Sequence, residues 1–176
     1  MSILYVDEVK SKTTNGAVKL TDTPIFHVTK SADQTLTDAT HTLITFDEIT
    51  DGSNSGRTIN RGGLFGSNKL TVTAATAGYY FLYTNIYWQS SDTTTGETYG
   101  YWRKNGSTKC DILYSNAQGL SDTVGVIKSA QVVDLTTGGD YVEFYVYMDV
   151  ANNGTCNINQ WDLNNSRTTV GGWLIG

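Results

Sequence analysis

The chain has 176 residues, a formal net charge of −5 and only 16 % charged residues, whereas aromatic residues make up 11 %. This length fits one domain that buries a core of its own. The negative balance and the scattered basic residues argue against a nucleic-acid partner, because binding a phosphate backbone needs clustered Lys and Arg. No stretch approaches the roughly 20 apolar residues of a membrane-spanning helix, so no membrane insertion is expected.

Residues 1–23 are predicted to form an N-terminal arm or anchor. They begin MSILYVDEVK, with acidic residues where an export signal needs an apolar run, so we expect no signal peptide and assembly in the cytoplasm. The arm either docks on another chain or adds a strand to its own sheet. The boundary falls near Thr23-Pro24, and the domain is expected to span residues 24–176.

Beyond this boundary, short strand-like runs alternate with turns rich in Gly, Asn and Ser. In chain order the main runs are PIFHVTKS, THTLITFDEIT, GGLFGSNKLTVTA, AGYYFLYTNIYW, TYGYWRKNG, TKCDILYS, VGVIKSAQVVDL, YVEFYVYMDV, CNINQWDL and TVGGWLIG. Few segments show helical periodicity. The pattern predicts an all-β sandwich or barrel of about ten antiparallel strands.

Three of these runs, residues 78–88, 141–150 and 170–175, carry large side chains on both faces, because alternate residues of a strand point to opposite sides. Either a loop covers the second face, or a neighbouring subunit does. Six of the aromatic rings, half covered, would present about 450 Å², which is the size of the largest patch on a typical monomer, and so an oligomer is favoured. The side chains expected at the subunit interface are Tyr79, Phe81, Tyr83, Tyr141, Tyr145, Tyr147 and Trp173.

The order of several short motifs resembles the C1q/TNF-like jelly roll. The matching stretches are FHV at 26–28, ITFDEI at 44–49, GYYFL at 78–82, KNG at 104–106, LTTGGDYVEF at 135–144 and VGGWLI at 170–175. Each motif is weak alone, but together they cover most of the chain in the right order. The resemblance implies a ten-stranded sandwich that assembles as a compact homotrimer. It also implies that the three two-faced strands lie together in the inner sheet, beside the three-fold axis.

The first twenty residues resemble the start of many tailed-phage fibre and appendage proteins, where a short strand precedes a binding domain. With the low charge and abundant Thr, Asn and Gly, this resemblance implies a bacteriophage virion structural protein. We expect a trimeric head-decoration or tail-fibre protein, joined to other virion proteins through its arm and in contact with the host surface. The alternative is a secreted or surface C1q-like module that binds a glycan or a protein.

Residues able to act as catalysts are few, and the chain is not expected to be an enzyme. His27 and His41 are the only imidazoles, one inside a strand and the other between threonines. Cys110 has no evident His partner for nucleophilic chemistry. The two cysteines, Cys110 and Cys156, favour two buried thiols over a disulfide.

Two kinds of ligand site have candidates. Trp102 and Trp161 could stack on sugar rings of a host glycan, or fill structural space. Oxygen atoms that could bind calcium come from Asp51, Asp149, Asn152 and Asn153, although the loop at 51–56 lacks the spacing and closing Glu of an EF-hand. We therefore expect no cofactor and treat calcium as the minor alternative.

Overall fold

The computed structural model describes residues 23–50, 58–91, 94–114, 124–150, 154–160 and 168–175. Every regular element in these ranges is a strand, which confirms the predicted all-β fold. The strands are β1 (Ile25–Thr29), β2 (Gln34–Leu36), β3 (Thr42–Leu43), β4 (Ile59–Arg61), β5 (Phe65–Gly66), β6 (Lys69–Thr71), β7 (Gly78–Ser90), β8 (Thr94–Lys104), β9 (Thr108–Tyr114), β10 (Val124–Leu135), β11 (Tyr141–Val150), β12 (Cys156–Ile158) and β13 (Thr169–Leu174). Apart from Thr23, the predicted arm lies outside the described residues.

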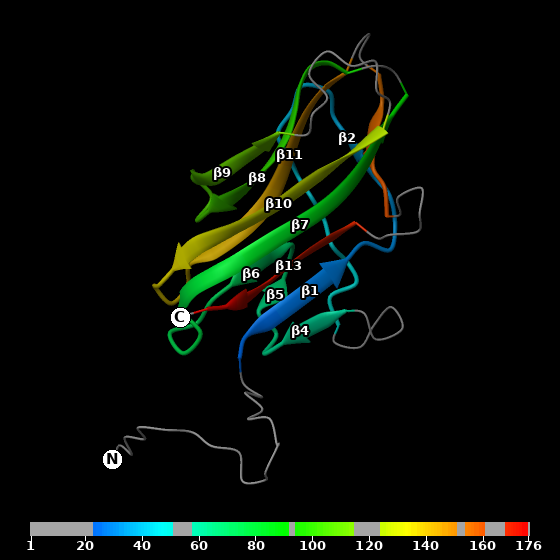
Figure 1. The fold of residues 1–176 in the computed structure, drawn as a ribbon. Coiled ribbons are helices and arrows are strands. Elements are labelled where there is room, and N and C mark those ends of the chain that lie inside the picture. Colours follow the sequence, from blue (N-terminus) through cyan, green and yellow to red (C-terminus); the bar gives the residue numbers. More distant parts are fainter. Residues whose placement is uncertain are drawn as a thin grey trace, which may run out of the picture.

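Seven strands form one layer of a two-layer sandwich, with the long β7 at its centre. One edge of β7 pairs along its length with β10, and the other edge pairs with β13 and then with β12. The sheet continues beyond β13 through β1 and β4, and beyond β12 through β2. In Figure 1 this sheet faces the viewer, and β10, β7, β13, β1 and β4 lie side by side.

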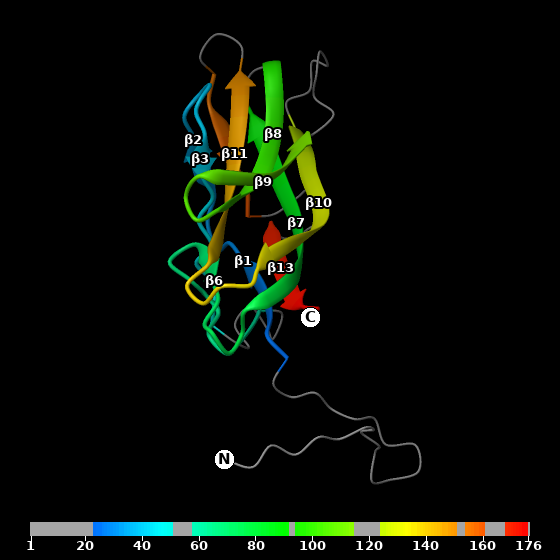
Figure 2. The same cartoon turned by 90° about the vertical axis from the view of Figure 1, so that its left-hand side faces the viewer.

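The second layer is a six-stranded sheet in the order β5-β6-β11-β8-β9, with β3 also paired to β11. Figure 2, turned by 90°, shows β7, β10 and β13 on one side of the sandwich and β6 and β11 on the other. All the strand pairs named here are antiparallel. None of the described residues forms a helix long and apolar enough to cross a membrane.

The core lies between the two sheets and is built from one face of each long strand, as the period-two pattern predicts. Large buried side chains from both sheets belong to one cluster: Tyr80, Leu82, Ile86 and Trp88 of β7, Val142, Phe144, Val146 and Met148 of β11, with Phe26, Ile127 and Val170. The opposite faces of β7 and β11 therefore point outward, on opposite sides of the sandwich.

The expectation that all three two-faced strands share one sheet is wrong. β7 and β13 lie in the seven-stranded sheet, whereas β11 lies in the six-stranded sheet. The reason is the short connection 136–140, which carries the chain from β10 in one sheet to β11 in the other. Within it the amide of Asp140 donates to the carbonyl of Thr137 at 2.9 Å, and Gly139 adopts a φ of +96°, a region that favours glycine. β10, not β11, is thus the neighbour of β7.

Candidate subunit interface

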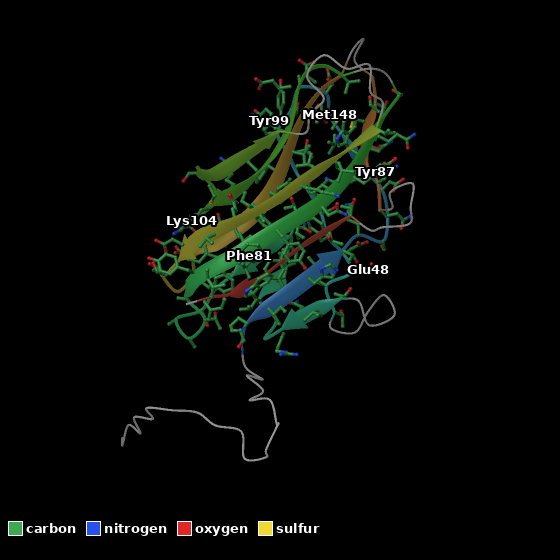
Figure 3. All side chains as sticks on the ribbon, in the orientation of Figure 1. Glu48, Phe81, Tyr87, Tyr99, Lys104 and Met148 are labelled. Atoms are coloured by element: carbon green, nitrogen blue, oxygen red, sulfur yellow. The ribbon has the colours of Figure 1, made fainter. Side chains whose placement is uncertain are left out.

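The outer face of the seven-stranded sheet carries an apolar row that crosses four strands. Val132 of β10 lies opposite Phe81 of β7, Phe81 lies opposite Trp173 of β13, and Trp173 lies opposite Ile25 of β1. Directly opposed residues in antiparallel strands project from the same face, so these four side chains form a continuous line. Figure 3 labels Phe81 on this sheet.

Two aromatic rings around this row contact Trp173, and several side chains of this face remain exposed. We call Tyr79, Phe81, Tyr83 and Trp173 the aromatic patch. The ring centroids of Phe81 and Trp173 are 4.6 Å apart, and those of Tyr83 and Trp173 are 6.3 Å apart. Even so, Tyr79 is 50 %, Trp173 38 % and the adjoining Val132 55 % exposed. Neighbouring large apolar side chains exposed to this degree mark an interaction surface.

Tyr83 is fixed in the patch by a histidine that sequence reasoning did not connect to it. The Nδ1 atom of His27 lies 2.6 Å from the hydroxyl oxygen of Tyr83, and the two rings stack at 6.0 Å. Between them in the sheet lies Gly171, which pairs with both residues. A Cβ atom at Gly171 would collide with the Tyr83 ring, so the missing side chain lets the phenol cross β13. Burial raises the pKa of Tyr83 and lowers that of His27.

Polar residues border the patch on several sides. Lys128, Asn85 and Thr169 form the next row across β10, β7 and β13. Asp134 lies opposite Tyr79, and Arg61 lies opposite Ile25 at the far edge. An apolar centre with a polar rim is the usual composition of a protein–protein contact.

The remaining predicted interface residues lie on the other side of the molecule. Tyr141, Tyr145 and Tyr147 project from the outer face of the six-stranded sheet, where β8 adds Tyr99 and Tyr101. The structure therefore brings together four of the seven predicted residues, and it separates them from these three by the thickness of the sandwich.

The second face differs because its rings are packed against groups of the same chain. We call Tyr99, Tyr101, Tyr145 and Tyr147 the tyrosine layer. Tyr99 stacks on Tyr147 with centroids 5.1 Å apart, and Tyr101 stacks on Tyr145 at 5.7 Å. The His41 ring adds a contact to Tyr147 at 4.9 Å. As a result Tyr99 and Tyr101 are buried although they belong to an outer face.

Two basic side chains of the same chain lie over aromatic rings of this second face. The guanidinium carbon of Arg103 lies 5.3 Å from the Tyr145 ring centroid, and the ammonium of Lys69 lies 4.5 Å from that of Tyr141. In a cation–π contact of this kind, a positively charged group lies over the face of the ring and occupies it. In the tyrosine layer Tyr99 and Tyr101 are thus buried, and Tyr145 and Tyr147 are partly buried by contacts within the same chain.

The predicted ligand-binding tryptophan on β8 is not available to a ligand. Trp102 is 1 % exposed and packs against Phe144 in the core, with ring centroids 5.3 Å apart. The alternation of β8 explains this position: Tyr101 and Arg103 point outward, so Trp102 points inward. Trp161, the second candidate, lies outside the described residues.

The structure describes only some residues of the calcium candidate, and it describes both cysteines. Asp51, Asn152 and Asn153 of the calcium candidate lie outside the described residues, and among the residues described no group of three or more His, Cys, Asp or Glu could hold a metal ion. Cys110 and Cys156 both remain thiols, as predicted, with Cys156 buried and Cys110 partly buried. Burial raises the pKa of Cys156 to about 12, which leaves its sulfur protonated and unreactive at neutral pH.

Comparison with known proteins gives a match at the level of structure. No protein-family model and no curated protein matches the chain. Eiger TNF of S. frugiperda is similar with a TM-score of 0.58 at 13 % identity, covering 88 % of this chain and 94 % of that one. Murine APRIL at pH 5.0 is similar with a TM-score of 0.58 at 15 % identity, covering 87 % of this chain and 99 % of that one.

The globular domain of zebrafish complement 1qA is also similar, with a TM-score of 0.52 at 13 % identity, covering 87 % of this chain and 98 % of that one. Identities this low show the fold alone. The chain therefore has a C1q/TNF-like jelly-roll fold, as its motif order predicted.

Proposed function

We propose that this protein is a homotrimeric C1q/TNF-like assembly module whose subunits meet through the aromatic patch. The observation that carries the proposal is the apolar row of Val132, Phe81 and Trp173, in which Val132 and Trp173 are exposed and which charged and polar residues border. Burying such a row releases water from apolar surface, which is the main driving force of association. The fold match adds support, because the C1q/TNF resemblance implies a compact trimer.

The proposal narrows the predicted interface. A stable contact buries about 800 Å² per subunit, so the aromatic patch forms its centre and the polar rows its border. Tyr141, Tyr145 and Tyr147 are left out, because their rings are engaged by Lys69, Arg103 and other aromatic rings of the same chain.

The assembly claim is tested by solution mass at micromolar concentration. The wild-type chain is expected to have three times the mass of one subunit. Phe81→Asp places a charge at the centre of the patch and should weaken the trimer at least about 30-fold, since losing an interface anchor costs about 2 kcal/mol or more. Tyr145→Asp, on the opposite face and beside Arg103, is the matched control and should remain trimeric. A monomeric wild-type protein would overturn the proposal.

At the level of biology, we propose a bacteriophage virion structural protein, used as a head decoration or tail-fibre appendage. Residues 1–23 would join the module to other virion proteins. Support comes from the resemblance of this arm to phage fibre proteins and from the low content of charged residues. Assembly and binding, rather than catalysis, are the roles proposed.

Purified particles test this assignment. Mass spectrometry should find the chain in virions, and its copy number per attachment site should be a multiple of three. Deleting residues 1–23 should leave a trimer in solution that no longer enters the particle. Absence from virions would leave the alternative, a secreted or surface C1q-like binding module.

A contact with a host-surface glycan is the last part of the proposal. Trp102 has no role in it because that side chain lies in the core. Trp161 remains the candidate. A glycan array should show binding by the wild-type protein and a loss with Trp161→Ala, and equal signals from the two proteins would remove Trp161 from the proposal.

A further inference from the structure

One of the two imidazoles of the chain lies at the edge of the proposed interface. His27 is half-buried on β1, in the same row as Tyr83, and its Nδ1 atom is 2.6 Å from the Tyr83 hydroxyl oxygen. The other imidazole of the chain, His41, lies on the opposite side of the sandwich against the tyrosine layer. Of the two imidazoles, only His27 therefore lies where its protonation could affect the contact between subunits.

Three charged side chains, Arg61, Glu48 and Lys128, lie within a few residues of His27 in the sheet. Arg61 of β4 lies opposite Ile25, which is two residues from His27 on the same face. The carboxylate of Glu48 accepts a hydrogen bond from Thr29, two residues in the other direction. Lys128 of β10 lies one row away, opposite Asn85 of β7, while the residues of β13 that face His27 are uncharged. Burial is the cause that lowers the pKa of His27 below its ordinary value of 6.5.

We propose that His27 makes the contact between subunits acid-sensitive: the trimer forms with this imidazole neutral and separates when it takes up a proton. The inference rests on the proposed function. Assembly removes further water from the patch, and a charge deprived of water without a partner is costly. In the protonated ring both nitrogens carry a proton, so Nδ1 would donate to the Tyr83 oxygen, and the positive charge itself would be carried into the apolar contact.

The direction of the pH effect follows from linkage. Because assembly deepens the burial of His27, its pKa is lower in the trimer than in the separated subunit. The trimer then binds fewer protons, so its stability is complete above the pKa of the separated subunit and falls as pH drops below it. Each His27 contributes up to about tenfold per pH unit to the dissociation constant, which gives up to about a thousandfold for three copies.

The experiment measures the monomer–trimer equilibrium by sedimentation at pH 8.0, 7.0, 6.0 and 5.5, a range above the ordinary titration of carboxylates. Wild-type protein should be trimeric at pH 8 and dissociate on acidification. His27→Asn retains an acceptor for the Tyr83 hydroxyl and should stay trimeric at pH 5.5. His41→Asn is the matched control and should dissociate like the wild type.

The outcomes separate this inference from the proposed function. No trimer at pH 8 overturns the proposed function. A wild-type trimer that persists unchanged at pH 5.5, or a His27→Asn trimer that still dissociates in acid, overturns the role of His27 alone. If His27→Asn does not assemble, an NMR titration decides. The His27 pKa should be lower in the wild-type trimer than in a monomeric Phe81→Gln subunit, which adds no charge beside His27, and equal values overturn the inference.

Discussion

The outer faces of the two sheets both carry rows of aromatic side chains, yet they differ in what covers them. On the six-stranded sheet, Tyr145 and Tyr147 stack on Tyr101 and Tyr99 within the same chain. On the seven-stranded sheet, Tyr79 stays 50 % and Trp173 38 % exposed. Aromatic content alone therefore does not identify an interface, because the number of partners within the chain decides whether a ring still needs another surface.

The two faces also differ in how the backbone beneath them is built. Under the aromatic patch, β13 passes close to β7 through Gly171 and Gly172. On the six-stranded sheet, Gly66 of β5 has open space where a side chain would stand. Close approach of the backbone under the patch can be tested separately from assembly.

The largest expected effect comes from Gly172→Ala. The added Cβ atom would collide with the backbone carbonyl oxygen of Phe81, which cannot move without disturbing the β7–β13 pairing. We expect a loss of about 3 kcal/mol in the free energy of unfolding, at the upper end for overpacking. Gly66→Ala is the control in the other sheet and should stay within about 0.5 kcal/mol of the wild type or be slightly stabilising. Urea denaturation measures both, and equal losses would contradict the proposed difference in backbone packing.

A smaller loss in the free energy of unfolding is expected from Gly171→Ala, which tests the hydrogen bond between Tyr83 and His27. Here the new Cβ atom meets the far end of a side chain, so the Tyr83 ring can swing away at the expense of its bond to His27. Losing one such hydrogen bond costs about 1 kcal/mol.

The same denaturation series measures this loss, and the NMR signal of His27 should shift with it. Tyr83→Phe removes the same hydrogen bond without adding bulk and should reproduce the His27 shift. An unchanged His27 signal in both variants would show that the bond does not form in solution.

The smallest effect is expected on the opposite face, from Arg103→Ala. This change removes the cation over the Tyr145 ring and should reduce the free energy of unfolding by about 0.5–1 kcal/mol. The mass of the assembly should not change, because this face is not in the proposed contact. Dissociation of the trimer by Arg103→Ala would show that both faces take part.

Much of the fold follows from local patterns, because alternation assigns a side chain to a face before any partner is known. Alternation along YVEFYVYMDV places Phe144 and Val146 on one apolar face, and both lie in the core. The same rule applied to TYGYWRK places Trp102 and Tyr101 on opposite faces, but it does not show which face is the core, because Arg103 lies on the face of Tyr101 and Lys104 on that of Trp102. The burial of Trp102 therefore could not be obtained from the local pattern.

The pairing of strands could not be obtained in the same way, since it depends on long-range contacts. β10 reads as a half-polar strand, with Lys128 and Asp134 exposed, and nothing local shows that it borders β7. The contact of His27 with Tyr83 joins residues 56 positions apart, across a glycine that has no pattern of its own. For the same reason the sequence could not show which tyrosines find partners within the chain.

The most direct test of the central claim is hydroxyl-radical footprinting, at neutral pH, of the wild-type assembly beside the same protein diluted below the concentration at which the trimer dissociates. Tyr79 and Trp173 should be oxidised more slowly in the assembly, whereas Tyr145 and Tyr147 should react alike in both samples. Equal oxidation of Trp173 in the two samples, or protection confined to Tyr145 and Tyr147, would contradict a contact through the seven-stranded sheet.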